Sequence, residues 1–410
     1  MSEAEAAGRE LARVVAAATI SNFGSMLTRI ALPFVAVDAL GASAREMSAL
    51  SAARLVPGLA LGIALSAWIE RRRKRGVMIG ADLAHAALLC AVPAAFALGA
   101  LSMPLLWAFA FCSGLLSFAF AVARQSFVPS LASRDQLVAA NARIAAGSNA
   151  AEALAFGVGG WLVQLLSAPL ALLADAFSYV ASAALLAGIP ERLEAARDRR
   201  SAGRGLQRAL AGLQAIRADA RLVALAVASL AIVVASEALG VVYFLFVRAE
   251  LGFEPGLLGL LFAAGSLAAL ASSLAADRLG GRFGARAATG GGLVAGALAT
   301  GVLALAPGPS WLGAACIFAQ QLGDAGLAVF EIHSLSARQE AAASEVQSRV
   351  HGAFSFFSGW AALAGAALGG ILGSAVGPRA TVALAAGALF AVGLAWLAAA
   401  PRFGARPAAS

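Results

Sequence analysis

Charged residues are what this chain has least of. Only 13% of its residues are charged and 61% are hydrophobic, against roughly 25% and 45–50% in a soluble domain. So little polar surface excludes the soluble classes of protein and predicts an all-α polytopic membrane protein. The net charge of +8 does not indicate a nucleic-acid partner, because the cations fall in short stretches between apolar runs.

Cysteines are scarce, and the sequence motifs of catalysis are missing. Cys90, Cys112 and Cys316 lie inside apolar runs without metal or redox spacing, so we expect them to be packing residues. A Walker lysine loop, a catalytic triad spacing and a Cys/His cluster are also missing from the sequence. We therefore expect no enzyme activity, no ATP site, no metal site and no cofactor.

Twelve apolar runs are long enough to cross a bilayer, at about 20 residues each. The first six cover residues 13–37, 48–69, 77–99, 104–123, 143–166 and 168–189. The second six cover residues 222–247, 256–276, 287–306, 310–332, 348–373 and 379–400. This pattern predicts twelve transmembrane helices in two six-helix lobes, 1–189 and 222–400, with a cytoplasmic basic linker over 190–221 and a cytoplasmic tail over 401–410.

Basic residues predict the orientation of the chain in the membrane. Five consecutive cations, Arg71–Arg75, follow Glu70 between the second and third runs. Such a block stays outside hydrocarbon, because each charge costs roughly 2.5–3.5 kcal/mol there. The loops on the other side carry only Arg45, Arg248 and Arg379, so both termini are expected in the cytoplasm. The arginine-rich composition is typical of a GC-rich bacterium and suggests its cytoplasmic (inner) membrane.

The basic linker also shows a helical pattern. Leu206, Leu210, Leu213 and Ile216 share one helical face, which predicts an amphipathic helix along the cytoplasmic leaflet. Basic loops of this kind are suited to binding anionic lipid.

The two halves of the chain resemble each other. Glu70 corresponds to Asp277, 207 residues later, and Arg143 corresponds to Arg349, 206 residues later. A glycine pair closes the fifth run and another closes the eleventh, and we expect both pairs to permit close helix packing. These residues are Gly159, Gly160, Gly369 and Gly370. Six spans repeated in parallel are the layout of a two-lobed transporter.

The loop between the second and third runs carries a known signature. The segment SAWIERRRKR, from Ser66 to Arg75, resembles the Gly-x-x-x-Asp-Arg/Lys-x-Gly-Arg-Arg/Lys loop of the major facilitator superfamily, with Ser66 and Arg73 replacing its glycines. The resemblance implies two gating loops that hold the outward-open state. Their residues are Glu70, Arg71, Lys74, Arg75 and, in the second copy, Asp277, Arg278 and Arg282.

A second stretch, Arg124–Leu162, is similar to the export branch of that superfamily, which contains enterobactin exporters and macrolide efflux proteins. The matching residues are Arg124, Phe127, Val128, Pro129, Leu131, Ala140 and Asn141. Leu172–Glu191 resembles the sixth span of that branch.

These resemblances imply a secondary active transporter that exports a small hydrophobic molecule, such as a drug, siderophore or metabolite. It would act by alternating access, with protons as the coupling ion in antiport, and as a monomer in the lipid bilayer. An importer or facilitator of the same fold is one alternative. A non-transporting membrane sensor or assembly component is the other.

Ionisable residues inside the apolar runs are candidates for substrate binding or proton coupling, because such residues are costly in a bilayer. Arg29 in the first run and Glu237 in the seventh are 208 residues apart, so they occupy similar depths in the two lobes. Either they pair across a central cavity, or each is satisfied within its own lobe, or one of them lies nearer the outer surface. Glu152 lies beside Asn149 in the fifth run. It is expected to be a proton carrier, a cap for a neighbouring helix end or a partner of Asn22.

Further polar residues lie in the tenth, third and sixth runs. Asp324 follows Gln320 and Gln321, and together they predict a polar face for substrate or for a water-filled path. Asp82 opens the third run near the arginine block, so we expect it in a cytoplasmic charge network. Asp175 in the sixth run is expected to form a structural hydrogen bond.

Overall fold

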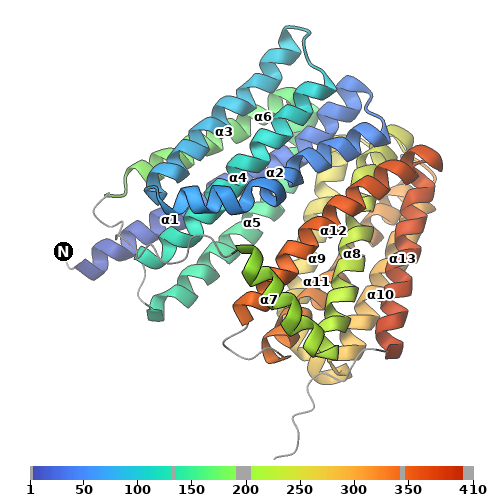
Figure 1. The fold of residues 1–410 in the computed structure, drawn as a ribbon. Coiled ribbons are helices and arrows are strands. Elements are labelled where there is room, and N and C mark those ends of the chain that lie inside the picture. The colour runs from blue at the N-terminus through green and yellow to red at the C-terminus, as the bar shows by residue number, and fades with distance from the viewer. Residues whose placement is uncertain (1–2, 132–133, 191–204, 342–346, 400–410) are drawn as a thin grey trace, which may run out of the picture. The chain divides into compact units, whose positions relative to one another are not determined.

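The computed structural model describes residues 3–131, 134–190, 205–341 and 347–399. The regular structure of these ranges is helical, without strands (Figure 1). Eleven of their helices are long and apolar enough to cross a membrane. A further helix, α5 (Arg134–Leu166), carries a shorter apolar stretch, Ala150–Leu166. These helices confirm the predicted all-α polytopic fold, with eleven full-length candidate spans and one shorter one.

Contacts divide the chain into two compact units. Unit 1 comprises Met1–Ala42, Leu50–Gly203 and Glu254–Ala263. Unit 2 comprises Ser43–Ala49, Arg204–Phe253 and Ala264–Ser410. The start of the second long helix therefore belongs to unit 2, and the start of the eighth span belongs to unit 1. The predicted tail over 401–410 lies outside the described residues, as does part of the predicted linker.

Unit 1 is built mainly from the first six long helices. They are α1 (Glu3–Phe34), α2 (Ala44–Glu70), α3 (Lys74–Ala97), α4 (Met103–Leu131), α5 and α6 (Ala168–Ala187). Alanine and leucine favour these helices, and a helix satisfies its own backbone hydrogen bonds inside lipid. Proline at the first turn of α6 suits a tight turn after α5, because its missing N–H would have no helical partner there.

The apolar interior of unit 1 lies at the end of the bundle near the basic block. Helices α1, α2, α3, α4 and α6 contribute side chains to it. The buried members are Leu11, Val14, Ala17, Ile69, Met78, Ala119, Ala123, Phe127, Val128, Leu186 and Ile189.

Unit 2 is built from the remaining helices. They are α7 (Gly205–Ala218), α8 (Ala220–Phe244), α9 (Pro255–Phe283), α10 (Ala285–Ala304), α11 (Trp311–Ala341), α12 (Gln347–Ala375) and α13 (Pro378–Ala399). The short α7 lies beside α12 (Figure 1), and a Cβ added at Gly212 would lie 2.8 Å from the Cβ of Ala353. Ile216 of α7 is buried in the apolar core with Phe330, Phe354 and Trp396.

The first membrane-spanning helix of each unit ends in the same irregular way. α1 continues into a π-helix, Val35–Ala39, and α8 continues into a π-helix, Leu245–Glu250. Phe34 precedes the first and Phe244 precedes the second, and pairing these two residues sets the register between the helices. In this register the counterpart of Arg29 is Leu239 rather than Glu237. Arg29 and Glu237 therefore do not occupy equivalent positions on their helices.

Candidate functional site

Four helices of unit 1 bring polar side chains into one interior region. Spacings of three, four or seven residues place them on a single face of each helix. We call this set the unit 1 polar cluster. It consists of Ser21, Ser25 and Thr28 of α1, Asp82 and His85 of α3, Ser113 of α4, and Asp175, Ser178, Tyr179 and Ser182 of α6.

Asp175 is held by hydroxyl groups. It is 1% exposed, and it accepts hydrogen bonds from Thr28 and, at 3.0 Å, from Ser178. A Cβ added at Gly24 would lie 2.8 Å from the Cβ of Ser178, so α1 needs glycine there to approach α6. The expected structural hydrogen bond of Asp175 is present, and its described partners are neutral.

Tyr179 and His85 continue the cluster from α6 to α3 and α4. The Tyr179 hydroxyl lies 2.9 Å from Ser25 Oγ. The His85 ring stacks on the Tyr179 ring, with centroids 4.4 Å apart. Nε2 of His85 lies 2.9 Å from Ser113 Oγ. The histidine is therefore fixed between two helices rather than exposed to solvent.

The prediction that Asp82 belongs to the cytoplasmic charge network is wrong. The residue is 0% exposed, and within the described chain neither carboxylate oxygen has a hydrogen-bond partner. Ser182 on α6 approaches it, but its hydroxyl is likewise without a partner of hydrogen-bond geometry. The reason is helical phase: Asp82 lies seven residues after Arg75, roughly 10 Å deeper on the same face of α3, which packs against α6.

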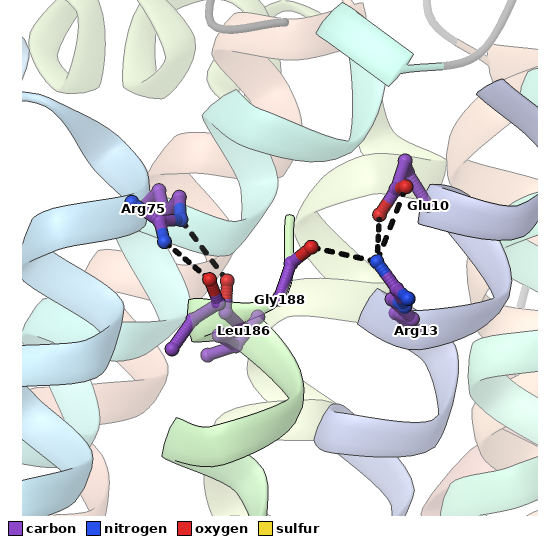
Figure 2. A network of polar contacts seen from close by, with 6 residues as sticks. Glu10, Arg13, Arg75, Leu186 and Gly188 are labelled. Carbon is purple, nitrogen blue, oxygen red and sulfur yellow. Dashed lines mark hydrogen bonds and ion pairs between the residues drawn. The ribbon is translucent and has the colours of Figure 1, made fainter. Parts of the chain in front are cut away.

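The basic block caps the end of α6 (Figure 2). Arg75 donates to the carbonyl of Leu186 at 3.0 Å and to that of Ala187 at 2.6 Å. Arg13 of α1 donates to the carbonyl of Gly188 at 2.6 Å and forms an ion pair with Glu10 at 3.0 Å. Cations at a helix C-terminus satisfy its last carbonyls and complement the helix dipole. Arg75 of the block therefore holds α3 to the end of α6, and Arg13 holds α1 there.

Unit 2 repeats this cap. Arg286 near the start of α10 donates to the carbonyl of Leu397 near the end of α13. Donor and acceptor are 111 residues apart, as are Arg75 and Leu186. The two arginines are therefore as far apart along the chain as the two leucines. The donor and the acceptor of the cap thus recur with the same offset between the two units.

Unit 2 contains a different polar cluster, between α8 and α11. Gln320 accepts from the Tyr243 hydroxyl at 2.9 Å and donates to Asp324 at 3.0 Å. Gln321 donates to the Tyr243 hydroxyl at 3.0 Å and to Gln320 at 2.9 Å. The three residues predicted to form a polar face thus form one hydrogen-bonded array, which we call the unit 2 amide cluster.

Tyr243 was not singled out from the sequence, although a signal was present. The chain has only two tyrosines; Tyr243 lies in the unit 2 amide cluster and Tyr179 in the unit 1 polar cluster. A buried tyrosine in a membrane helix normally brings a hydrogen-bond partner for its hydroxyl. Because the chain has only two tyrosines, each of them could have pointed to one of the two polar clusters.

Comparison with known proteins identifies the family. A family model described as the Major Facilitator Superfamily matches residues 14–318. The chain belongs to the major facilitator superfamily. The search of curated proteins gave no match.

Solved transporters share the fold of this facilitator. A nucleoside transporter, NupG, superposes with a TM-score of 0.76 at 12% identity, covering 95% of this chain and 98% of that one. A bacterial homologue of the iron transporter ferroportin in an inward-facing state gives 0.74 at 16%, covering 95% and 98%. A bacterial homologue of the human lysosomal transporter Spinster gives 0.70 at 14%, covering 97% and 96%. Identities this low show the fold alone.

The remaining coupling candidates of this facilitator are more scattered. Arg29 is exposed, with Nη1 3.5 Å from the sulfur of Met26. Glu237 is partly buried on the side of α8 that faces Gly365 of α12. Asn22 donates to the carbonyl of Ser148 at 3.1 Å. Glu152 is partly buried and forms no hydrogen bond to Asn22 within the described chain, and the side chain of Asn149 lies outside the described residues.

The predicted gating residues lie at helix ends. Glu70 ends α2 and is exposed, and within the described residues it forms no ion pair. Lys74 donates to the carbonyls of Glu70 at 3.0 Å and Arg72 at 2.7 Å. Exposed cations near these ends are Arg71, Arg278 and Arg282. The side chain of Asp277 lies outside the described residues.

The four glycines predicted to allow packing each face another helix. A Cβ added to Gly159 would lie 2.9 Å from Leu27 Cδ2, and one added to Gly160 would lie 2.8 Å from Gly259 Cα. A Cβ added to Gly369 would lie 2.8 Å from Ala238 Cα, and one added to Gly370 would lie 2.7 Å from Ser48 Oγ. Distances under 3.0 Å leave no room for a side chain.

Within the described residues, no group of three His, Cys, Asp or Glu side chains is arranged to hold a metal ion.

Proposed function

We propose that this facilitator exports a small hydrophobic molecule across the bacterial cytoplasmic membrane by alternating access, as a monomer coupled to proton antiport, with both termini in the cytoplasm. The supporting observation is a set of carboxylates inside the spans whose described hydrogen-bond partners are neutral or missing, namely Asp82, Asp175 and Asp324. An ionised carboxylate without a cation is costly in such surroundings. A group that binds and releases a proton during the cycle needs this kind of site.

The unit 2 amide cluster is the proposed substrate contact. Asp324 and Gln321 are only partly buried, whereas Gln320 and Tyr243 are buried beneath them. The inner pair therefore orients the outer pair, and the outer pair presents a carboxylate and an amide to a molecule that enters. We keep the other sequence candidates as secondary contacts: Arg29, Glu237, Glu152, Asn22 and Asn149.

We further propose that the two basic loops take part in gating. Glu70→Ala is expected to weaken the outward-open state, and Asp277→Ala is expected to do the same through the second copy. Cysteine accessibility at the two membrane faces measures that balance. Unchanged accessibility and transport would leave these loops with orientation and capping alone.

The proposed function is tested in everted membrane vesicles that carry a respiratory pH gradient. Macrolides, catecholate siderophores and lipophilic dyes are added one at a time, while acridine orange reports the gradient. A substrate of a proton antiporter partly dissipates the gradient in vesicles with the protein and not in vesicles without it. Asp324→Asn should abolish that response, whereas Asp38→Asn, at an exposed carboxylate, should preserve it.

The export direction has its support in the similarity of Arg124–Leu162 to the export branch. An importer or facilitator would instead accumulate or equilibrate the compound in right-side-out vesicles without consuming the gradient in everted ones. A non-transporting sensor or assembly component would be silent in both preparations across the whole panel. Either result would overturn export.

A further inference from the structure

We propose that the unit 2 amide cluster selects substrates that carry an ammonium group with N–H donors, so that the transported molecule is a lipophilic primary or secondary amine. The inference rests on the proposed function, which makes this cluster the substrate contact, and it adds the chemical class of the substrate. Three features support it: the direction of the hydrogen bonds in the cluster, the accessibility of the acceptors that remain, and the charge of the surrounding spans.

Asp324 fixes the direction of the hydrogen bonds in the cluster. An ionised carboxylate only accepts hydrogen bonds, so Gln320 turns its amide N–H toward Asp324, at 3.0 Å. The carbonyl oxygen of Gln320 then points to the other side, where it accepts from Tyr243 and Gln321. Gln321 uses both of its N–H groups within the cluster, on Gln320 and on Tyr243. The partly exposed pair, Asp324 and Gln321, therefore offers a ligand only acceptors.

The two remaining acceptor oxygens are accessible. Within the described residues, Oδ1 of Asp324 and Oε1 of Gln321 take part in no hydrogen bond, yet neither belongs to the buried atoms that lack a partner. Asp324 also lies roughly 160° around α11 from Leu322, which forms an exposed apolar stripe with Phe318. The carboxylate thus faces away from a stripe suited to lipid, as intramembrane charges almost always do. A dissolved ligand can reach both oxygens.

A glycine of α9 sets the position of the second acceptor. A Cβ added at Gly265 would meet Oε1 of Gln321 and would lie 3.0 Å from the Cβ of that residue. Any side chain at this place would push the amide of Gln321 away from α9. Gly265 is therefore a positioning residue for the acceptor pair.

The spans in the second half of the chain hold no lysine or arginine that could match Asp324. The stretches without either residue are 222–247, 255–277, 287–304, 311–337, 350–375 and 380–399. Asp324 accepts from a neutral amide, that of Gln320, and a carboxylate without a cation is costly in apolar surroundings. An alkylammonium group supplies positive charge at neutral pH and, like the lysine head group, several N–H donors. It suits both free oxygens at once.

The substrate class is tested by the binding of matched probes to the purified full-length protein in nanodiscs, without a pH gradient. The probes share a naphthylethyl group and end in a primary amine, its N-acetyl derivative, a carboxylic acid or a trimethylammonium group. The amine should bind at least about tenfold tighter than the other three, because it alone combines positive charge with N–H donors. Isothermal titration calorimetry measures the four dissociation constants.

Asp324→Asn removes the charge and keeps the cluster. Its amide oxygen can still accept from Gln320, while its N–H2 group replaces the free acceptor by a donor. The amine should then bind no tighter than the N-acetyl probe, whose retained binding shows that the variant is folded. Gly265→Ala should weaken the amine more than the N-acetyl probe. Asp38→Asn, at an exposed carboxylate, is the matched control and should keep the wild-type preference.

The outcomes separate the substrate class from the proposed function. Equal affinity of the wild-type protein for the amine and the N-acetyl probe overturns the class and leaves export of a neutral molecule to the vesicle assay. Equal affinity for the amine and the trimethylammonium probe overturns recognition by the free acceptors. A preference for the amine that survives Asp324→Asn overturns its assignment to this cluster. If the amine binds as proposed and no compound is transported in vesicles, the site stands and the proposed function fails.

Discussion

The two units of this facilitator share a backbone plan and differ in what they enclose. Both have a first span that ends in a π-helix and an arginine that caps the sixth span. Deeper than the cap, the interior is polar in unit 1, around Asp82, and apolar in unit 2, around Leu293, the residue that the step from Arg75 to Arg286 pairs with Asp82. The π-helix and the arginine cap occur in both units, so we infer that the fold needs them. The polar interior around Asp82 is a feature of unit 1 and is not needed for the fold of unit 2.

Unit 2 places its polar residues elsewhere. Its amide cluster joins α8 to α11 through Tyr243 and Gln320, whereas the unit 1 polar cluster joins α1 and α3 to α6. Every member of the unit 2 amide cluster is hydrogen-bonded to another member, and Gln321 and Asp324 are partly accessible. In the unit 1 polar cluster, Asp82 and Ser182 are fully buried and lack hydrogen-bond partners within the described residues.

The largest effect is expected from transferring the carboxylate to the apolar unit. Leu293→Asp would bury a polar group without partners, which should lower the free energy of unfolding by at least about 2 kcal/mol. Thermal unfolding in detergent measures the loss. Leu293→Met is the size-matched control, with a change below about 1.5 kcal/mol. Equal stability of the two variants would mean that unit 2 tolerates charge as unit 1 does.

Substitution of the capping arginines tests how much the contact shared by both units stabilises the fold. Arg75→Gln removes two charged hydrogen bonds to carbonyls and should destabilise the protein by about 1.5–3 kcal/mol. Arg286→Gln removes the bond to Leu397 and should have the smaller effect. Arg71→Gln, at an exposed cation of the same loop as Arg75, should change stability by less than about 0.5 kcal/mol. If all three variants unfold alike, the caps do not stabilise the fold.

A double variant can make unit 1 resemble unit 2. Asp82→Leu with Ser182→Gly installs Leu293 and Gly393, the residues of unit 2 that the step from Arg75 to Arg286 pairs with Asp82 and Ser182. It removes two buried polar groups that lack hydrogen-bond partners within the described residues, so the free energy of unfolding should rise by about 1–3 kcal/mol. Thermal unfolding in detergent measures the gain. A less stable double variant would assign the polar cluster to packing.

The smallest effect concerns a cap that starts α8. Asp219 precedes that helix and accepts from the backbone N–H of Arg221 at 2.7 Å. Hydrogen bonds from Arg221 lower the pKa of the Asp219 carboxyl, so its stabilisation is present above the ordinary carboxyl range and is lost as the pH falls through the lowered value. Asp219→Ala should cost about 1 kcal/mol at neutral pH and nothing at the acid end. An unfolding profile with the same pH dependence in both proteins would contradict this role.

The sequence was sufficient for the coarse plan and for residues that are neighbours along one helix. Apolar runs predicted the helices, and the spacing of Gln320, Gln321 and Asp324 predicted their shared face. The rotation of α3 that buries Asp82 depends on its packing against α6, which is distant in the chain, and no local pattern records it. The glycine pairs predicted to correspond, Gly159 with Gly369 and Gly160 with Gly370, have the same separation as Phe34 and Phe244 at the two π-helices. The other predicted offsets, such as that from Glu70 to Asp277, were a few residues too short.

The arginine caps indicate how the two halves of the chain arose. Two donors and two acceptors at one common separation of 111 residues are most simply explained as a single ancestral contact that was copied when the gene doubled. The buried carboxylates have no such twin, so unit 1 gained them or unit 2 lost them after the copies diverged. The cap is therefore older than that divergence, whereas the difference between the two units at Asp82 and Asp175 arose after it.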